Sequence, residues 1–316
     1  MTENITGIHH ITAIAGDPQE NLDFYAGVLG LRLVKRSVNQ DSPGTYHFFF
    51  ADADGHPGTD LTFFPWPDMG PGRIGTGKAS EISLAVPHGS LGYWQERLGR
   101  YGARTGETVT RRGAPALLVG DPHGLPLSLV EAEERTEFTA WERGPVPAER
   151  QIRGLHSLRT KVLNLAPTAA FLTESLGFRE VGEEDGWHGF ALGDGGSCRF
   201  MEIRETPEGP RGEWGVGSMH HVAWRVPDDT TETVVRRRVA AAGRHPTEVI
   251  DRFWFKSVYF QEPGGVLFEL ATDGPGFTTD EDHGTLGEQL VLPPWLEPHR
   301  RDIVAALPVV ELRQFP

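Results

Sequence analysis

The sequence predicts an α+β fold of four βαβββ modules, which pair to form two incomplete barrels. Two internal repeats support this prediction: GIHHITAIA from Gly7 matches GLHSLRTKV from Gly154, and SEISLAVP from Ser80 matches HHVAWRVP from His220. The third observation is that 39 Gly and 24 Pro lie as turn residues between apolar runs, which indicates many short strands. Long internal repeats constrain the fold more than any local motif does.

The strands expected at 7–15 and 154–162 are each followed by a helical pattern. In the first pattern, Asp17–Leu31, residues Leu22, Tyr25 and Leu29 fall on one helix face, and Asp17-Pro18 suits an N-cap and first turn. The second pattern, Asn164–Phe178, likewise ends in Leu-Gly before an apolar residue. Both modules therefore begin with one strand and one helix.

The strands expected at 80–87 and 220–227 begin two further modules. Helical patterns follow them, with apolar residues at Leu91, Trp94 and Leu98 in one and at Val235, Val239 and Ala242 in the other. Each module then reaches a Pro-X-Gly turn and a terminal apolar strand, within Asp121–Glu131 and Glu262–Thr272. Such a turn ahead of a short apolar run signals the start of a strand.

The four modules cover residues 5–68, 79–133, 151–205 and 216–273. We divide the chain into an N-terminal half (1–133), a polar linker (134–150), a C-terminal half (151–279) and a tail (280–316). A module with one amphipathic helix cannot cover both faces of its sheet, so two modules are expected to pair around a concave interior that suits a small site. The tail has a helical pattern limited by Pro residues, and this helix could cover the opening of the concave interior or form an interface.

The composition argues against several classes of partner. With 30 Lys and Arg against 44 Asp and Glu, the formal charge is −14, which would repel nucleic acid and acidic membranes. Cys198 is the single cysteine, which excludes an internal disulfide framework and a thiolate zinc site. We find no signal-peptide pattern and no run of about 18 apolar residues. We therefore expect a soluble cytoplasmic protein that acts on a small molecule, and these features are compatible with a homo-oligomer.

Two modules carry a histidine at a first-strand position that all four share. The residues at this position are His10, Glu81, Ser157 and His221. Glu269 lies in the otherwise apolar strand VLFEL, where a buried carboxylate needs a cation or several hydrogen bonds. Two imidazoles and one carboxylate form the facial triad typical of non-haem Fe(II) oxygenases, and the same set also suits catalytic zinc.

Strand alternation turns one ring of each His-His pair inward and the other away. We choose His10 and His221 as metal ligands because they begin the alternating runs, which leaves His9 and His220 to orient a ligand or act as acid or base. The opposite assignment, with His9 and His220 as the ligands, stays open. A lone histidine in a strand is more often a structural residue than a metal ligand. Ligands from modules one and four require these two modules to share a barrel, so we expect pairs 1+4 and 2+3.

Two further side chains compete for roles in the site. Glu202 in RFMEIRE is the competing carboxylate, but its module has Ser157 where a histidine would be needed. Glu202 therefore fits a salt bridge or a vestige better. His188 in DGWHGF is a candidate substrate contact.

These features together resemble the ring-cleaving dioxygenases of the vicinal oxygen chelate superfamily. The similar stretches are GIHHITAIAGDPQENLDFYAGVLGLRLVKRSVN, GSMHHVAW and DRFWFKSVYFQEPGGVLFELATDGPGF. The similarity spans nearly the whole chain, including LGEQLVLPPWLEPHR in the tail. Within the superfamily, these stretches resemble the hydroquinone 1,2-dioxygenase branch.

The resemblance implies Fe(II), or Mn(II), bound by His10, His221 and Glu269. It also implies that His9, His220, Arg252 and Tyr259 surround the metal and take part in catalysis. Arg252 could stabilise a phenolate or superoxide, and Tyr259 could hydrogen-bond a metal-bound oxygen. A surface salt bridge and a core tyrosine are equally ordinary roles for these two residues.

Aromatic residues near the expected ligands fit a flat substrate. We assign Trp224 and Phe255 to substrate binding, although core packing would leave the same residues there. The implied activity is extradiol-type ring cleavage of a hydroquinone or catechol-like aromatic with O2. The alternatives are a metal-dependent glyoxalase or isomerase without O2, which usually has four protein ligands, and a small-molecule-binding protein without a metal.

Overall fold

Each predicted module forms one strand, one helical segment and three more strands in the computed structural model, which describes residues 4–133, 137–313 and 315. The first module contains β1 (Gly7–Ala15), α1 (Pro18–Leu22) with the π-helical η1 (Asp23–Val28), β2 (Arg32–Val38), β3 (Tyr46–Ala51) and β4 (Asp60–Pro65). The second contains β5 (Lys78–Val86), α2 (Leu91–Arg100), β6 (Arg104–Arg111), β7 (Ala114–Gly120) and β8 (Pro126–Glu131).

The C-terminal modules repeat this order after a single turn of 3₁₀ helix, η2 (Ala148–Arg150). The third module contains β9 (Gly154–Val162), α3 (Leu165–Ala170) with the π-helical η3 (Phe171–Ser175), β10 (Arg179–Glu184), β11 (Trp187–Ala191) and β12 (Phe200–Glu205). The fourth contains β13 (Ser218–Val226), α4 (Asp229–Ala241), β14 (Ile250–Asp251), β15 (Lys256–Gln261) and β16 (Leu267–Thr272).

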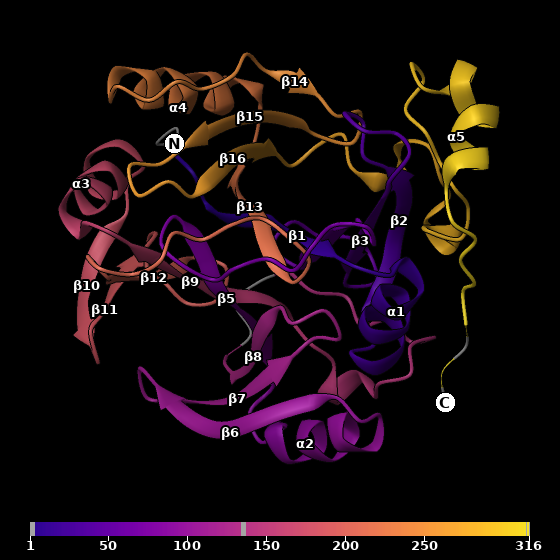
Figure 1. Cartoon of the computed structure of the whole chain (residues 1–316), viewed down its shortest axis with the longest axis horizontal. Helices are drawn as coiled ribbons and strands as arrows, with labels where there is room; N and C mark the ends of the chain where they lie inside the picture. The colour runs from indigo at the N-terminus through magenta and orange to yellow at the C-terminus, as the bar shows by residue number, and fades with distance from the viewer. Residues whose placement is uncertain (1–3, 134–136, 314, 316) are drawn as a thin grey trace.

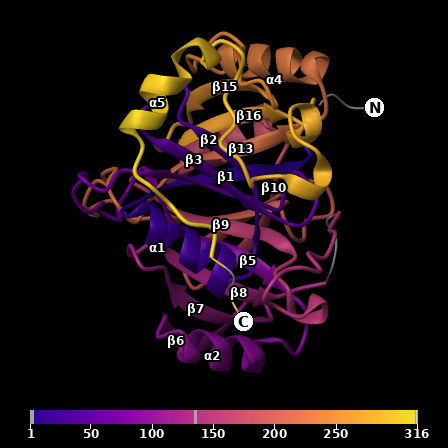
Figure 2. The ribbon, with the colours of Figure 1, turned by 90° about the vertical axis from the view of Figure 1, so that its right-hand side faces the viewer.

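The modules pair as the sequence predicted, one with four and two with three. One eight-stranded sheet has the order β14-β15-β16-β13-β1-β4-β3-β2, and the other has the order β10-β11-β12-β9-β5-β8-β7-β6. In the first sheet β1 runs antiparallel to β13, and in the second β5 runs antiparallel to β9. Each sheet therefore combines one module from each half of the chain, and the two sheets lie one above the other in Figures 1 and 2.

The first helix begins at its predicted cap. The side chain of Asp17 accepts hydrogen bonds from the backbone N–H groups of Gln19 and Glu20, and Asn164 caps α3 by accepting one from the N–H of Ala166. The first helical segment ends at Val28, shorter than the predicted Asp17–Leu31, because Gly30 takes a positive φ of 71° that suits a helix terminus.

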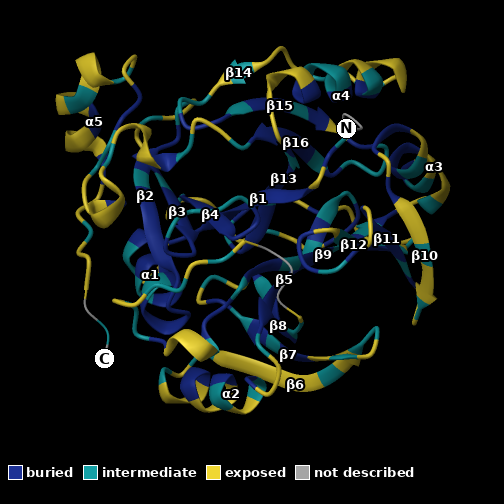
Figure 3. Cartoon of the chain, turned by 180° about the vertical axis from the view of Figure 1, so that it is seen from behind, coloured by how far each residue is buried: buried dark blue, intermediate teal, exposed yellow. Residues whose placement is uncertain are grey.

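Most apolar side chains join one core that runs through both sheets. It contains fully buried side chains from all four modules, among them Trp94, Leu158 and Trp224. Figure 3 shows that the central strands are buried, whereas the edge strands β6 and β10 are largely exposed. A second, smaller cluster lies on the inner face of the first sheet and includes Phe49, Trp254 and Phe255. This inner face carries the candidate site.

The tail runs along β2 and carries the predicted Pro-limited helix as η6 (Glu297–His299) and α5 (Arg300–Ala306), together with the 3₁₀ turn η5 (His283–Thr285). A further 3₁₀ turn, η4 (Phe277–Thr279), lies just before the tail. Several bonds attach the tail to β2; among them, the Ser37 hydroxyl donates to the Val291 carbonyl, and buried Lys35 binds Asp280 at 2.7 Å. No helix in the described part of the chain is long and apolar enough to cross a membrane.

Candidate metal centre

His10, His221 and Glu269, the three predicted ligands, meet on the inner face of the first sheet. They come from the neighbouring strands β1, β13 and β16, and their side chains are 2%, 4% and 0% exposed. Glu269 Oε2 lies 2.9 Å from His221 Nε2 and 3.4 Å from His10 Nε2, and the two Nε2 atoms are 3.4 Å apart. Segments that are far apart in sequence thus bring three donor atoms to one point.

The spacing of these donor atoms fits a divalent transition metal. Ligands at about 2.1 Å from an ion lie roughly 3.0 Å apart when their bonds are at right angles, and roughly 3.4 Å apart in a tetrahedron. The three observed distances fall between 2.9 and 3.4 Å, so they suit either arrangement. One carboxylate and two imidazoles therefore fit iron, manganese or zinc.

Burial of these charged groups would destabilise the fold if their charges were not compensated. Burial alone would raise the pKa of Glu269, but His10 and His221 hold it well below its usual value. Burial opposes a charge on His10 as well, yet Glu269 raises the pKa of His10. Glu269 Oε1 also accepts a hydrogen bond from Ser257 at 2.5 Å. The carboxylate is therefore held ionised and fixed in place.

In each His-His pair, the two rings contact each other through their Nδ1 atoms. His9 Nδ1 lies 3.0 Å from His10 Nδ1, and His220 Nδ1 lies 2.8 Å from His221 Nδ1. Burial lowers the pKa of His9 well below its usual value and the pKa of His220 to about 3, so both rings are neutral at pH 7. A neutral ring can accept the Nδ1–H of its neighbour, which leaves the Nε2 lone pair of that neighbour facing the centre.

A cavity of about 400 Å³ opens beside the three donor atoms. Its walls are largely aromatic, and the short loop 39–42 borders it. The aromatic lining residues are Phe49, Phe64, Trp66, Trp254, Phe255 and Tyr259. The volume and flat walls suit a single-ring ligand.

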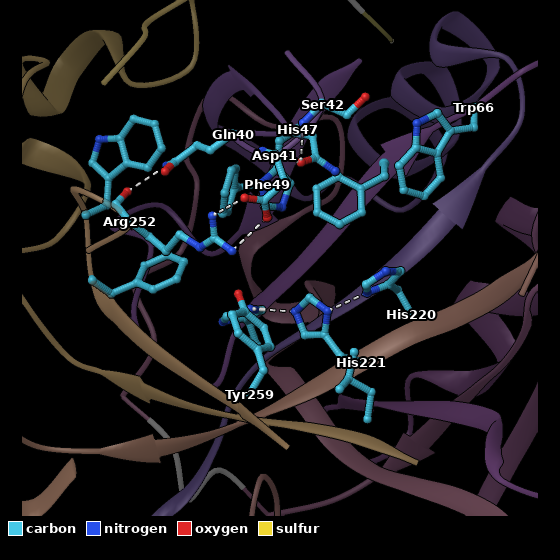
Figure 4. Close-up of a pocket in the computed structure, with 16 residues that line it drawn as sticks. Gln40, Asp41, Ser42, His47, Phe49, Trp66, His220, His221, Arg252 and Tyr259 are labelled. Carbon is cyan, nitrogen blue, oxygen red and sulfur yellow. Dashed lines mark hydrogen bonds and ion pairs between the residues drawn. The ribbon is translucent and has the colours of Figure 1, made fainter. Parts of the chain in front are cut away.

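Arg252 and Tyr259, two of the predicted catalytic residues, line this cavity together (Figure 4). The guanidinium of Arg252 lies over the Tyr259 ring, 5.5 Å from its centroid, and Tyr259 pairs with Glu269 across the strands β15 and β16. His220 and Phe255 also line the cavity. His9 is not among the lining residues and packs against Phe255, with ring centroids 5.4 Å apart.

Trp224 and His188, two of the predicted substrate contacts, lie elsewhere. Trp224 is fully buried in the main core, where its ring packs against Phe178 and Phe268. It follows His221 by three residues, so strand alternation places it on the opposite face. His188 belongs to β11 in the second sheet and contacts Glu180. The assignment of these two side chains to the cavity is therefore corrected.

Several cavity residues were not predicted from the sequence. A chain of hydrogen bonds runs from His221 Nε2 through Thr12 and Thr62 to His47, with distances of 2.8, 2.7 and 2.9 Å. Thr12 follows His10 by two residues, so strand alternation could have placed it on the same face. His47 reaches the cavity from β3, and loop residues Gln40 and Asp41 border it, without any sequence signal of their position.

The corresponding positions of the second sheet hold ion pairs in place of a ligand triad. Arg111 binds Glu81, whose carboxylate also accepts a hydrogen bond from Ser128 at 2.7 Å. Glu202 is held between Arg112 at 3.0 Å and Arg159 at 2.7 Å, which explains its buried charge without a metal. The second barrel therefore fills its inner face with its own side chains.

Comparison with known proteins gives a consistent picture. A family model of the glyoxalase/bleomycin resistance protein/dioxygenase superfamily matches residues 7–129 and 155–270. The chain is 43% identical to "Putative ring-cleaving dioxygenase MhqO" of Bacillus subtilis over 316 residues, covering all of both chains. It is 31% identical to chlorohydroquinone/hydroquinone 1,2-dioxygenase of Sphingobium indicum over 305 residues, covering 94% of each chain.

Solved structures agree with these matches. A crystal structure of a "putative dioxygenase" from Bacillus subtilis superposes with a TM-score of 0.92, at 41% identity and 99% coverage of each chain. Glyoxalase I from Zea mays superposes with a TM-score of 0.62 at 15% identity, covering 84% of this chain and 92% of that one, which shows a shared fold alone.

Proposed function

The chain belongs to the glyoxalase/bleomycin resistance protein/dioxygenase superfamily, and on that basis we propose that it is a non-haem Fe(II) ring-cleaving dioxygenase. Its substrate is a hydroquinone or a catechol-like aromatic, and its second substrate is O2. The observation that carries the proposal is the buried cluster of His10, His221 and Glu269 beside an aromatic cavity. Relatives named ring-cleaving dioxygenases, one of them a hydroquinone dioxygenase, support the same reaction.

In this proposal His10, His221 and Glu269 hold the metal. Three protein donors on one side leave coordination positions open, and a bound Fe(II) would supply the redox chemistry that couples an aromatic diol to O2. His9 and His220 fix the orientation of the two ligand rings through their Nδ1 contacts. Mn(II) fits the same donor set.

The remaining cavity residues bind the ring and handle protons. Phe49, Trp254 and Phe255 provide flat apolar walls that exclude water from the ring. His220, neutral at the cavity wall, accepts the Nδ1–H of His221 at its own Nδ1, so its Nε2–H can donate a hydrogen bond to a substrate oxygen. Burial raises the pKa of the Tyr259 hydroxyl, so this group stays protonated and acts as a hydrogen-bond donor. Arg252 offers a permanent positive charge against developing negative charge on oxygen.

Oxygen uptake tests this proposal. The purified protein, without a His-tag, is reconstituted with Fe(II) under anaerobic conditions, and O2 consumption is then measured with a panel of hydroquinones and catechols. We expect one O2 consumed per ring, with a ring-opened product of substrate mass plus two oxygen atoms. Protein that holds stoichiometric iron and consumes no O2 with any diol would refute the dioxygenase assignment.

The glyoxalase and isomerase alternative is tested in the same experiment. Reconstitution with Zn(II) gives the same protein with a metal that has no redox chemistry. We expect no conversion of a diol in that preparation. Turnover of a ring substrate by the zinc form in the absence of O2 would favour the alternative.

A further inference from the structure

Arg252 and Asp41 are the cation and the carboxylate among the residues that line the cavity. The lining histidines His10 and His221 lie at the metal centre, where both contact Glu269. Arg252 and Asp41 therefore determine the charge that a ligand meets on entering the cavity.

Asp41 binds Arg252 with both carboxylate oxygens. Oδ2 accepts from Nη2 at 2.9 Å, and Oδ1 accepts from Nη1 at 3.2 Å (Figure 4). This two-point geometry is the strong form of an arginine–carboxylate pair. The guanidinium side is largely buried, with 14% of the Arg252 side chain exposed, whereas 76% of the Asp41 side chain is exposed.

The loop that carries Asp41 is held in place on both sides of this residue. The side chain of Asn39 accepts hydrogen bonds from the backbone N–H groups of Asp41 and Ser42, at 2.9 and 3.2 Å. Gln40 donates a hydrogen bond from its amide to the Arg252 carbonyl at 2.9 Å. Asp41 therefore faces Arg252 because its loop is built to that shape, and not through a chance surface contact.

The pair has a direct consequence for the ligand. A ring that carries a carboxylate would be attracted to Arg252 if this cation were free, but Asp41 already occupies the outer donors of the guanidinium. Such a ring must displace Asp41 from the guanidinium or place a second negative charge beside the Asp41 carboxylate, where the two like charges repel. An uncharged ring meets neither obstacle.

We propose that Asp41 determines substrate charge: the cavity admits uncharged dihydroxybenzenes and rejects rings that carry a carboxylate. The inference takes the ring class from the proposed function. The selection itself concerns binding and does not depend on turnover.

Binding to the metal-free full-length protein tests this inference. The probes are 2,5-dihydroxybenzoate and 2,5-dihydroxybenzamide, which differ in charge and little in shape, and their dissociation constants are measured by titration calorimetry. We expect the wild-type protein to bind the amide at least 10-fold more tightly than the carboxylate. In Asp41→Asn the carboxylate should gain at least 10-fold, so that the preference falls to 3-fold or less.

Two control variants separate this effect from general electrostatics. Asp302→Asn removes the same charge from the exposed face of α5 and should keep the wild-type ratio. Asp41→Glu keeps the charge and should retain most of the preference. Equal binding of the two probes to the wild-type protein would overturn the inference, as would an equal change of the ratio in Asp302→Asn.

The results also distinguish this inference from the proposed function. If Asp41→Asn relaxes the preference while the iron-loaded protein consumes no O2, the charge selection stands and the dioxygenase assignment fails. If neither probe binds the metal-free wild-type protein, the charge selection fails, and oxygen uptake by the iron-loaded protein decides the dioxygenase assignment separately.

Discussion

Replacement of Glu269 by glutamine is the sharpest test of the metal centre. The side chain is fully buried, and its Oε2 atom lies 2.9 Å from His221 Nε2 and 3.4 Å from His10 Nε2. Glutamine preserves the volume, and with its amide oxygen in the Oε2 position its NH2 group faces the Ser257 hydroxyl, which can turn to accept. The substitution therefore removes one negative charge from the donor set while leaving the shape of the site nearly unchanged.

The loss of affinity follows from that charge. At an effective dielectric constant of about 20, two unit charges about 4 Å apart interact by about 4 kcal/mol, and a dication doubles this value. Part of this is retained because the amide oxygen remains a donor, so we expect metal binding to weaken by at least 100-fold, or about 2.7 kcal/mol. A weaker effect would mean that Glu269 is not a ligand.

Thermal unfolding with and without metal measures this loss. At a free metal concentration 1,000 times the wild-type Kd, binding stabilises the folded state by about 4 kcal/mol, and a 100-fold weaker variant retains about 1.4 kcal/mol. At roughly 2 to 4 °C per kcal/mol, the increase in Tm should fall from about 8–16 °C to about 3–6 °C. Glu202→Gln is the matched control, because it removes a buried carboxylate from the second sheet, and it should keep the full metal-dependent increase. Equal increases in wild type and Glu269→Gln would refute our ligand assignment.

Three further predictions concern stability. Lys35→Met should lower the free energy of unfolding by about 3–5 kcal/mol in urea, since it leaves two partly buried carboxylates unpaired; a loss under 1 kcal/mol would contradict the pairing. Burial raises the pKa of Glu232 to about 7, so its ionisation opposes folding increasingly as pH rises from about 4.5 through 7. Glu232→Gln should therefore be more stable than wild type by about 1–2 kcal/mol at pH 8, after a discount for solvent screening, and equally stable at pH 4; a constant difference across this range would count against it. Trp224→Ala should cost about 3–5 kcal/mol yet leave the metal affinity of the folded protein unchanged, and a tenfold loss of affinity would place Trp224 at the site after all.

The repeats in the sequence predicted most of the fold. The matched stretches that begin at Gly7 and Gly154 became β1 and β9, and those that begin at Ser80 and His220 became parts of β5 and β13. The pairing of module one with module four also followed, because ligands placed on both modules had to meet. Repeats are visible in sequence because each module must bury the same face of its own sheet.

The sequence also selected His10, His221 and Glu269, because charged or imidazole side chains are conspicuous in strands that are otherwise apolar. It could not place the aromatic residues. Trp224 and Phe255 look equally suitable in the sequence, but Trp224 faces the core from β13, whereas Phe255 faces the cavity from the loop between β14 and β15.

Only the tertiary structure decided the loop contacts at the mouth. Asp41 and Arg252 lie 211 positions apart, in a loop and beside a strand edge, where no periodicity fixes the direction of a side chain. His47 lies in a strand, β3, but its hydrogen bond to Thr62, which links it to His221 through Thr12, depends on the pairing of β3 with β4 and of β4 with β1. Periodic burial is a local property of the chain and can be read from sequence, whereas contacts between loops depend on how the two modules close around the cavity.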